Sequence, residues 1–147
     1  MKIPQLLFYI KRSLNKNVVI YKYNKNTDGQ LDSKNPIEHY WILKEQKNKI
    51  APLNLLERNL AYGFTITHQS SKSTRLNIKS IPYYPLKIVP FKNSYIAQIK
   101  LDGKWCHLVS VYVKLKQGFI KKVDWVDVNI KENETIQSRR LDLSKHT

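Results

Sequence analysis

The sequence predicts a mainly β fold, an antiparallel barrel or sandwich of about seven to nine short strands with one short packed helix. Short segments alternate apolar and polar residues, turn-forming residues separate these segments, and no strand–helix–strand rhythm recurs. The chain has 147 residues, 41% of them hydrophobic, and neither a linker nor a low-complexity tract divides it. It is therefore predicted to form a single domain over residues 1–147.

Three strands are predicted in the N-terminal part of the chain. Residues 6–12 alternate in polarity, and residues 18–23 are rich in β-branched and aromatic side chains. The five residues between them, 13–17, suit a hairpin connection. A turn-rich stretch over 24–36 then leads to a third strand over 37–43.

One short helix is predicted over about residues 53–62. Pro52 stands where the start of a helix tolerates proline, and Gly63 follows where glycine is favoured after a helix. A helix of this length is not stable alone, so its leucine stripe must pack on the sheet. The stripe consists of Leu53, Leu56 and Leu60.

Two further short strands are predicted over 64–68 and 75–79. Three prolines, Pro82, Pro85 and Pro90, then predict an edge or a loop region. The reason is that proline cannot donate the main-chain hydrogen bond that a central strand requires.

The C-terminal third carries the clearest strand pattern. Residues 95–101 and 104–115 flank Asp102-Gly103, a favoured two-residue hairpin turn, and later strands are predicted over 119–130 and 135–143. Strict alternation along 104–115 would place two sets of side chains on opposite faces. One set is Trp105, His107, Val109, Val111, Val113 and Leu115, and the other is Cys106, Leu108, Ser110, Tyr112 and Lys114.

The protein is strongly basic, with 26 Lys and Arg against 11 Asp and Glu and a formal net charge of +15. Two segments, 1–27 and 68–101, contain no acidic residue. If these segments share a face, they would attract a polyanion such as nucleic acid or an anionic surface. The 26 basic residues are 21 Lys and only five Arg, and this composition favours a solvated surface without a dedicated partner.

Catalytic and metal sites have little support in the sequence. Cys106 and His107 are neighbours, but consecutive side chains of a strand point to opposite faces and cannot form a nucleophile–base pair. The four histidines lack the spacing of a metal site. We therefore predict no catalytic residue, metal ligand or cofactor. An enzyme that uses Cys106 or His107 with a residue of a neighbouring strand is the alternative.

The sequence as written predicts a cytoplasmic protein. The apolar stretch from Leu6 to Ile10 is shorter than the core of a signal peptide, and no apolar run approaches the ~18 residues of a transmembrane segment. The single Cys106 agrees with a reducing compartment. A periplasmic or exported location applies if the start is truncated.

Three short sequence motifs can be recognised within residues 7–64. They are Leu7-Phe8-Tyr9-Ile10 with Arg12-Ser13 and Asn15/Asn17; Leu31-Asp32 with Asn35-Pro36-Ile37 and Tyr40-Trp41-Ile42; and Glu57-Arg58 with Ala61-Tyr62-Gly63. Together they resemble an uncharacterised bacterial family, domain-of-unknown-function family 4833. The resemblance covers nearly the whole chain and implies one compact domain, but it implies no activity.

The resemblance also implies a candidate ligand-binding site from the polar and aromatic members of these motifs. They could converge as a structural network, in which Arg12 pairs with Asp32 or Glu57 and holds the helix on the sheet, or as the lining of a pocket. Motif residues at a helix–sheet junction commonly set packing, which favours the network. The six residues are Arg12, Asp32, Trp41, Glu57, Arg58 and Tyr62.

The predicted function is a non-enzymatic binding module. Aromatic residues, nine of them Tyr, are distributed through nearly every strand and could line a cavity or a face for a small molecule or a protein partner. The alternative is polyanion binding through segments 1–27 and 68–101. Ligand and partner identities are left open.

Overall fold

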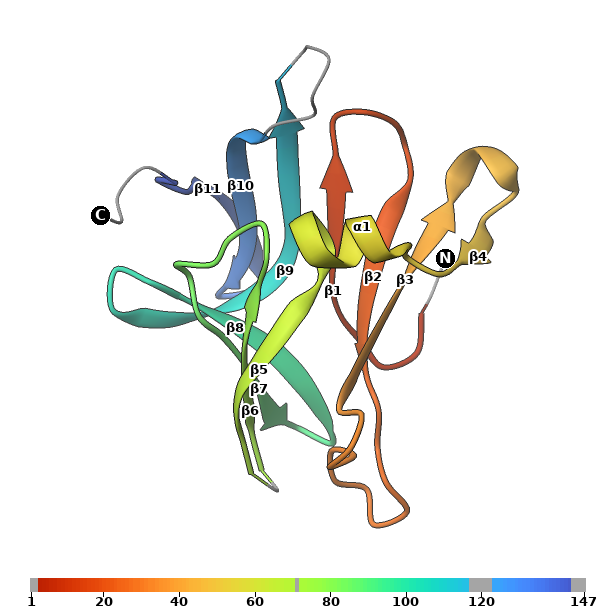
Figure 1. Ribbon diagram of the computed structural model, residues 1–147. Helices are drawn as coiled ribbons and strands as arrows, with labels where there is room; N and C mark the ends of the chain where they lie inside the picture. Colours follow the sequence, from red (N-terminus) through yellow and green to blue (C-terminus); the bar gives the residue numbers. More distant parts are fainter. Residues whose placement is uncertain (1–2, 71, 117–122, 144–147) are drawn as a thin grey trace.

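The computed structural model describes residues 3–70, 72–116 and 123–143. One sheet of eleven strands curls into a half-barrel, and strands make up 60% of the structure (Figure 1). This confirms the mainly β prediction, with more strands than the seven to nine expected. The strands are β1 (Leu6–Arg12), β2 (Val18–Tyr23), β3 (Ile37–Leu43), β4 (Lys49–Ala51), β5 (Phe64–Gln69), β6 (Thr74–Ile78), β7 (Leu86–Phe91), β8 (Ser94–Leu101), β9 (Lys104–Leu115), β10 (Val123–Glu132) and β11 (Thr135–Arg140).

The long strand β9 is the centre of the sheet. The start of one edge of β9 pairs with β8 in antiparallel orientation. Further along the same edge, β9 pairs with β1, and this is the parallel pairing among the described strands. Its other edge pairs with β10, which in turn pairs with β11. Beyond β1 the order runs β2, β3, β4, and beyond β8 it runs β7, β6, β5. The N-terminal strands and the middle strands therefore meet along β9 (Figure 1).

The hairpin between β8 and β9 follows the sequence prediction. Asp102 and Gly103 have φ angles of 51° and 78°. Two successive residues with positive φ are what a type I′ turn requires, and this turn matches the twist of the two strands that it joins. The register that follows places Lys100 opposite Trp105.

A β-bulge in β9 overturns the predicted alternation of its side chains. Ser110 pairs with Asn129 and Leu108 pairs with Ile130, so Val109 is an extra residue without a partner on β10. The extra residue reverses the alternation at that point. The buried face of β9 is consequently formed by Cys106, Leu108, Val111 and Val113, and the opposite face by Trp105, His107, Ser110 and Tyr112.

The predicted helix is shorter and less regular than expected. The α-helical turn α1 (Leu55–Glu57) continues directly into a π-helical segment, η2 (Arg58–Tyr62). Asn54 begins the helix as its N-cap, because its side-chain oxygen accepts the Glu57 N–H at 2.7 Å. Leu53 is buried but precedes the helix, and the side chains of the other two stripe leucines, Leu56 and Leu60, lie outside the described residues.

Two strands were not expected from the sequence. β4 has three residues and follows a short 3-10 helix, η1 (Lys44–Gln46). β7 lies in the proline-rich region, where an edge or loop was predicted, yet it pairs with both β6 and β8. Its pairing with β6 ends at Ile88, so Pro90 has no main-chain partner to satisfy on that side. Further along, β10 begins at Val123. The strand was predicted from residue 119, and positions 119–122 lie outside the described residues.

The sheet buries apolar side chains on both faces. We call the face that carries the main core, including Phe8, Tyr21 and Ile99, the inner face. The opposite, outer face of β1–β3 carries a second, smaller cluster formed by Val18, Ile20 and Ile42. Because successive residues of β2 point to opposite faces and nearly all are apolar, β2 contributes to both clusters.

Candidate functional site

Four of the six candidate residues meet at the junction of the helical segment and the sheet. The Arg12 guanidinium carbon, at the end of β1, lies 4.6 Å from the centroid of the Trp41 ring and 6.0 Å from that of Tyr62. The two rings themselves pack edge to face, with centroids 5.4 Å apart. We call Arg12, Trp41, Glu57 and Tyr62 the Arg12 cluster.

Glu57 ties this cluster to the start of the helix. Its Oε1 accepts the Trp41 indole N–H at 3.0 Å and the main-chain N–H of Asn54 at 2.9 Å. The second bond completes a capping box, since Asn54 in turn accepts the Glu57 N–H. One carboxylate thus caps the helix and fixes a buried indole on β3, which holds α1 against the inner face.

Tyr62 is buried where η2 ends. Burial raises the pKa of its hydroxyl above the ordinary 10.0, although Arg12, which donates a hydrogen bond to that hydroxyl, acts in the opposite direction. Its main-chain oxygen accepts the Tyr21 hydroxyl at 2.6 Å, a bond that links η2 to β2. The phenol therefore stays protonated around neutral pH and serves as a hydrogen-bonding and packing group.

The structure places the other two candidates elsewhere. Asp32 lies in the β2–β3 loop, where its carboxylate accepts the main-chain N–H groups of Lys34 and Asn35. These bonds lower its pKa from 3.8. Arg58 lies at the start of η2, and its charge acts on His39. Arg12 forms an ion pair with neither Asp32 nor Glu57 within the described chain; it packs over two rings instead. A role for the six residues in ligand binding stays a prediction.

His39 is a partly buried titratable group beside the cluster. Its ring lies between Tyr21 and Phe64, at centroid distances of 5.6 Å and 5.1 Å, and its Nε2 has no hydrogen-bond partner in the described structure. Burial, and then the positive charge of Arg58, lower its pKa from 6.5. The neutral imidazole is the form that fits this site.

We expect the free energy of unfolding to fall as the pH drops below 6.5, the ordinary pKa of histidine. Below this pH the histidine of the unfolded chain binds a proton, whereas folded His39 does not yet bind one. The stabilisation of the folded state by neutral His39 is therefore complete above pH 6.5 and is lost as the pH falls below it. Urea unfolding at about pH 7.5 and about pH 5.5 measures the fall. His39→Gln should reduce it and exposed His68→Gln should not, while His107, whose pKa burial also lowers, accounts for a remainder. An undiminished fall in His39→Gln would contradict the assignment.

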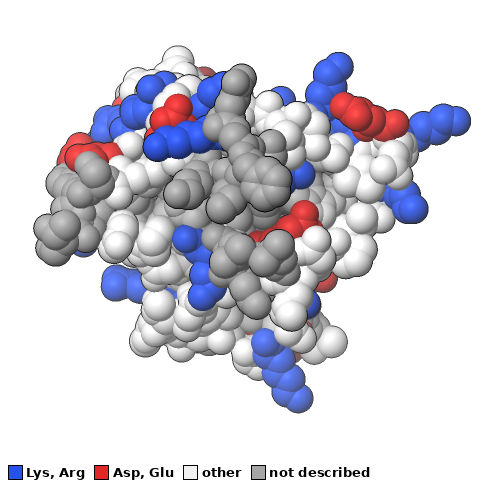
Figure 2. Space-filling model, turned by 45° about the horizontal axis from the view of Figure 1, so that its top comes forward, with Lys and Arg blue, Asp and Glu red and all other residues white. Residues whose placement is uncertain are grey.

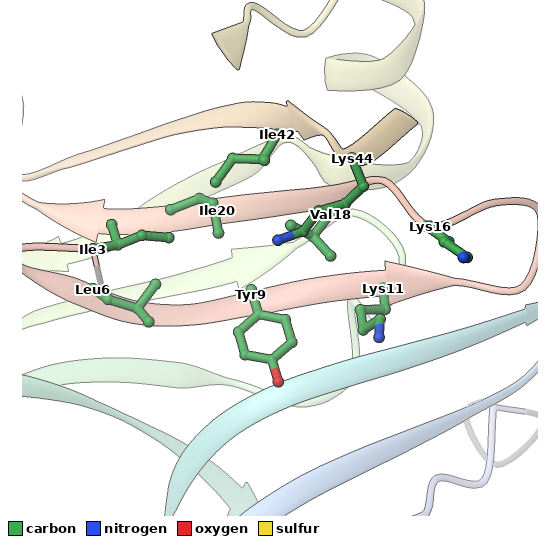
Figure 3. A pocket seen from close by; sticks show the side chains of 9 residues that line it. All are labelled: Ile3, Leu6, Tyr9, Lys11, Lys16, Val18, Ile20, Ile42 and Lys44. Carbon is green, nitrogen blue, oxygen red and sulfur yellow. The ribbon is translucent and has the colours of Figure 1, made fainter. Parts of the chain in front are cut away.

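A groove on the outer face of β1–β3 was not predicted. Its volume is about 220 Å³. Figure 3 shows Ile3 and Leu6 towards one end, Tyr9 in the middle and lysine side chains towards the other end. We call this the lysine-rimmed groove. Its lining residues are Ile3, Leu6, Tyr9, Lys11, Lys16, Val18, Ile20, Ile42 and Lys44.

Only some of the residues that line this groove could be predicted from the sequence to lie on one face. The presence of apolar residues on both faces of β2 indicates that both faces are covered, and Tyr9 and Lys11 share one side of β1. Lys16 and Lys44, however, come from a hairpin loop and from the residue after β3. Their approach to Lys11 depends on the pairing of β1, β2 and β3, which no local pattern reveals.

The two acid-free segments meet in the fold. Segment 1–27 includes β1, segment 68–101 includes β8, and both strands pair with the same edge of β9. On the face in Figure 2, however, Lys and Arg side chains are dispersed among other residues and do not form one dense patch. The meeting of the two segments therefore does not by itself create a single basic patch on this face.

Cys106 and His107 point to opposite faces of β9. The Cys106 thiol is buried in the inner core and lies 3.7 Å from the Lys104 carbonyl oxygen. His107 lies on the outer face, opposite Gln98. Within the described ranges, no three His, Cys, Asp or Glu side chains gather as metal ligands would. The helical segments of the described chain do not include a membrane-spanning helix.

Comparison with known proteins places the chain in a family. No curated protein and no solved structure matches it. A family model described as "Domain of unknown function (DUF4833)" matches residues 8–139, which include most of β1 and nearly all of β11. The match also includes all four residues of the Arg12 cluster. Since it extends over most of the sequence, the chain belongs to the DUF4833 family.

Proposed function

We propose that this domain is a non-enzymatic binding module that holds a small amphipathic anion in the lysine-rimmed groove. The observation that supports it is that Lys11, Lys16 and Lys44 line one apolar groove and approach it from the same end. A ligand with an apolar body and a carboxylate, sulfate or phosphate end matches this division of the lining.

The groove floor supplies the apolar part of the site. Val18, Ile20 and Ile42 are 6%, 2% and 2% exposed, so they present a fixed surface. Leu6, at the other end, is 36% exposed and would lose water on contact with a ligand. A volume of about 220 Å³ is below that of drug-sized pockets, which begin at roughly 300 Å³, so one short alkyl chain or one small ring fits.

The lysines supply charge selection. None of the lining residues is acidic, and none of the three lysines forms an ion pair with a described carboxylate. All three lysines bring positive charge to the same groove, and an anion bound there would offset the repulsion between them. Tyr9, between the two ends, offers the face of its ring to the apolar part of the ligand.

Calorimetric titration with decanoate tests the proposal, with decanol and decyltrimethylammonium as ligands of the same chain length. We expect decanoate to bind and the cation not to bind. In a protein labelled at isoleucine methyl groups, decanoate should shift the NMR signals of Ile20 and Ile42. If decanol binds as tightly as decanoate, or if decanoate does not bind, the proposal is wrong.

Two charge-matched variants separate the groove from the general positive charge. Since about 1.4 kcal/mol corresponds to a factor of ten in affinity, loss of the rim charges should weaken decanoate binding by about tenfold or more. The control, which removes equally many exposed lysines, should bind as the wild type does; equal weakening in both would reject the site. The groove variant is Lys11→Gln/Lys16→Gln/Lys44→Gln, and the control is Lys34→Gln/Lys72→Gln/Lys79→Gln.

A further inference from the structure

On the outer face of β6–β9, cationic side chains gather round Trp105. Arg75 lies opposite Lys87 in the sheet register, and Lys100 lies opposite Trp105. The Arg75 guanidinium carbon lies 5.6 Å from the centroid of the Trp105 ring, the Lys87 nitrogen 4.2 Å and the Lys100 nitrogen 5.8 Å. Three positive charges from three strands thus converge on one half-buried ring. We call these four residues the Trp105 face.

This arrangement carries charge that the protein does not compensate. None of the three cations forms an ion pair with a carboxylate of the described chain. Like charges directly opposite each other across a strand pair are destabilising, and Arg75 and Lys87 are such a pair. The Trp105 ring offsets part of the repulsion through cation–π attraction. An external anion would remove the rest.

A second aromatic platform lies on the same face of the sheet. Phe91, at the end of β7, is 45% exposed, and its ring centroid lies 6.3 Å from that of His107. The Lys92 nitrogen lies 5.2 Å from the Phe91 ring centroid. Rings and cations therefore alternate across the outer face of β7–β9.

We infer that the Trp105 face binds single-stranded nucleic acid. The phosphates pair with Arg75, Lys87 and Lys100 and draw these side chains off the Trp105 ring, and bases stack on Trp105 and on Phe91. Aromatic side chains interleaved with cations on an exposed sheet are what unpaired bases and their backbone require, whereas the bases of a duplex are not free to stack. This site uses none of the groove residues and is independent of the function proposed above.

Fluorescence anisotropy with a fluorescein-labelled thymidine oligonucleotide of about 12 nucleotides tests the inference. Displacement of counterions from three phosphates predicts a slope of about −2 for the logarithm of affinity against the logarithm of salt concentration. Stacking should also quench tryptophan fluorescence. A duplex of the same length should bind more weakly. Absence of binding at low salt, or equal affinity for duplex and single strand, would overturn the inference.

Three variants separate stacking from charge attraction. Trp105→Leu keeps an apolar side chain on the sheet but removes the ring face, and should weaken binding about tenfold or more, whereas Trp105→Phe should retain most of the affinity. Arg75→Gln/Lys87→Gln/Lys100→Gln should flatten the salt dependence. Urea unfolding confirms that each variant is folded before its affinity is read.

The charge-matched control is the same Lys34→Gln/Lys72→Gln/Lys79→Gln variant, which should bind the oligonucleotide as the wild type does. The groove variant should also bind it normally. The inference is wrong if Trp105→Leu binds normally. It is also wrong if the control loses as much affinity as Arg75→Gln/Lys87→Gln/Lys100→Gln, because attraction to general positive charge then explains the binding.

Discussion

Gly63→Ala should destabilise the protein by about 3 kcal/mol. A Cβ at this position would lie 1.8 Å from the Arg58 carbonyl oxygen and 2.7 Å from its carbonyl carbon. These atoms belong to the main chain of η2 and cannot turn away as a side chain would. Movement of Gly63 is also resisted, because its carbonyl accepts the Lys79 N–H and that of Ala61 accepts the Ser80 N–H, both at 2.9 Å.

Urea unfolding followed by tryptophan fluorescence measures this loss, and Gly29→Ala is the matched control. Gly29 has a φ of 78°, with nothing within 4 Å of an added Cβ. Gly29→Ala should lower the free energy of unfolding by only about 1 kcal/mol, because alanine is less stable than glycine in the left-handed backbone conformation. Gly63 was predicted as a helix-ending glycine, but its φ of −68° is ordinary and the structure requires it for space. Equal losses in the two variants would show that η2 yields to the methyl group.

Glu57→Ala should cost about 2–3 kcal/mol, the second-largest effect. The variant removes the acceptor of the Trp41 indole N–H, which then remains unpaired in a residue only 4% exposed. It also removes the side-chain half of the capping box, so the main-chain N–H of Asn54 loses its partner. Thermal and urea unfolding should both show the loss.

Glu57→Gln is the informative companion of this variant. Its amide oxygen can accept the same two N–H groups, so it should recover most of the stability. Glu134→Ala removes an exposed carboxylate that pairs with Lys131 at 3.6 Å, and should change stability by less than about 0.5 kcal/mol. If Glu57→Gln is as unstable as Glu57→Ala, the charge of Glu57 matters more than its hydrogen bonds.

The parts of the fold that local rules govern could be predicted from the sequence. The Asp102-Gly103 turn fixed the register of its hairpin, and β1, β2, β3 and β9 have their predicted bounds. The bulge at Val109 could not be predicted, because the sequence around it alternates regularly and only the pairing with β10 reveals the extra residue. β7 was not predicted either, because proline argues against a paired strand and the sequence does not show that the pairing of β7 with β6 ends at Ile88, before Pro90.

The candidate sites, too, could be predicted from the sequence only in part. The family motifs singled out Arg12, Trp41, Glu57 and Tyr62, which the structure brings together, but they also included Asp32, which only shapes its own loop. The groove and the Trp105 face bring together lysines, and in the second case one arginine, that are distant in sequence. Lysines are so frequent in this chain that no local pattern distinguishes the clustered ones from the rest.

The parallel pairing of β1 with β9 has a consequence for the order of folding. The Leu115 N–H donates to the Ser13 hydroxyl at 3.0 Å across 102 residues of chain, one of the longest-range bonds of the fold. During synthesis, β1 emerges long before β9, so its pairing edge stays open while most of the protein is made. Contacts of such separation form slowly, and an open apolar edge can pair with another chain. Conditions that delay β9 should therefore favour aggregation through β1.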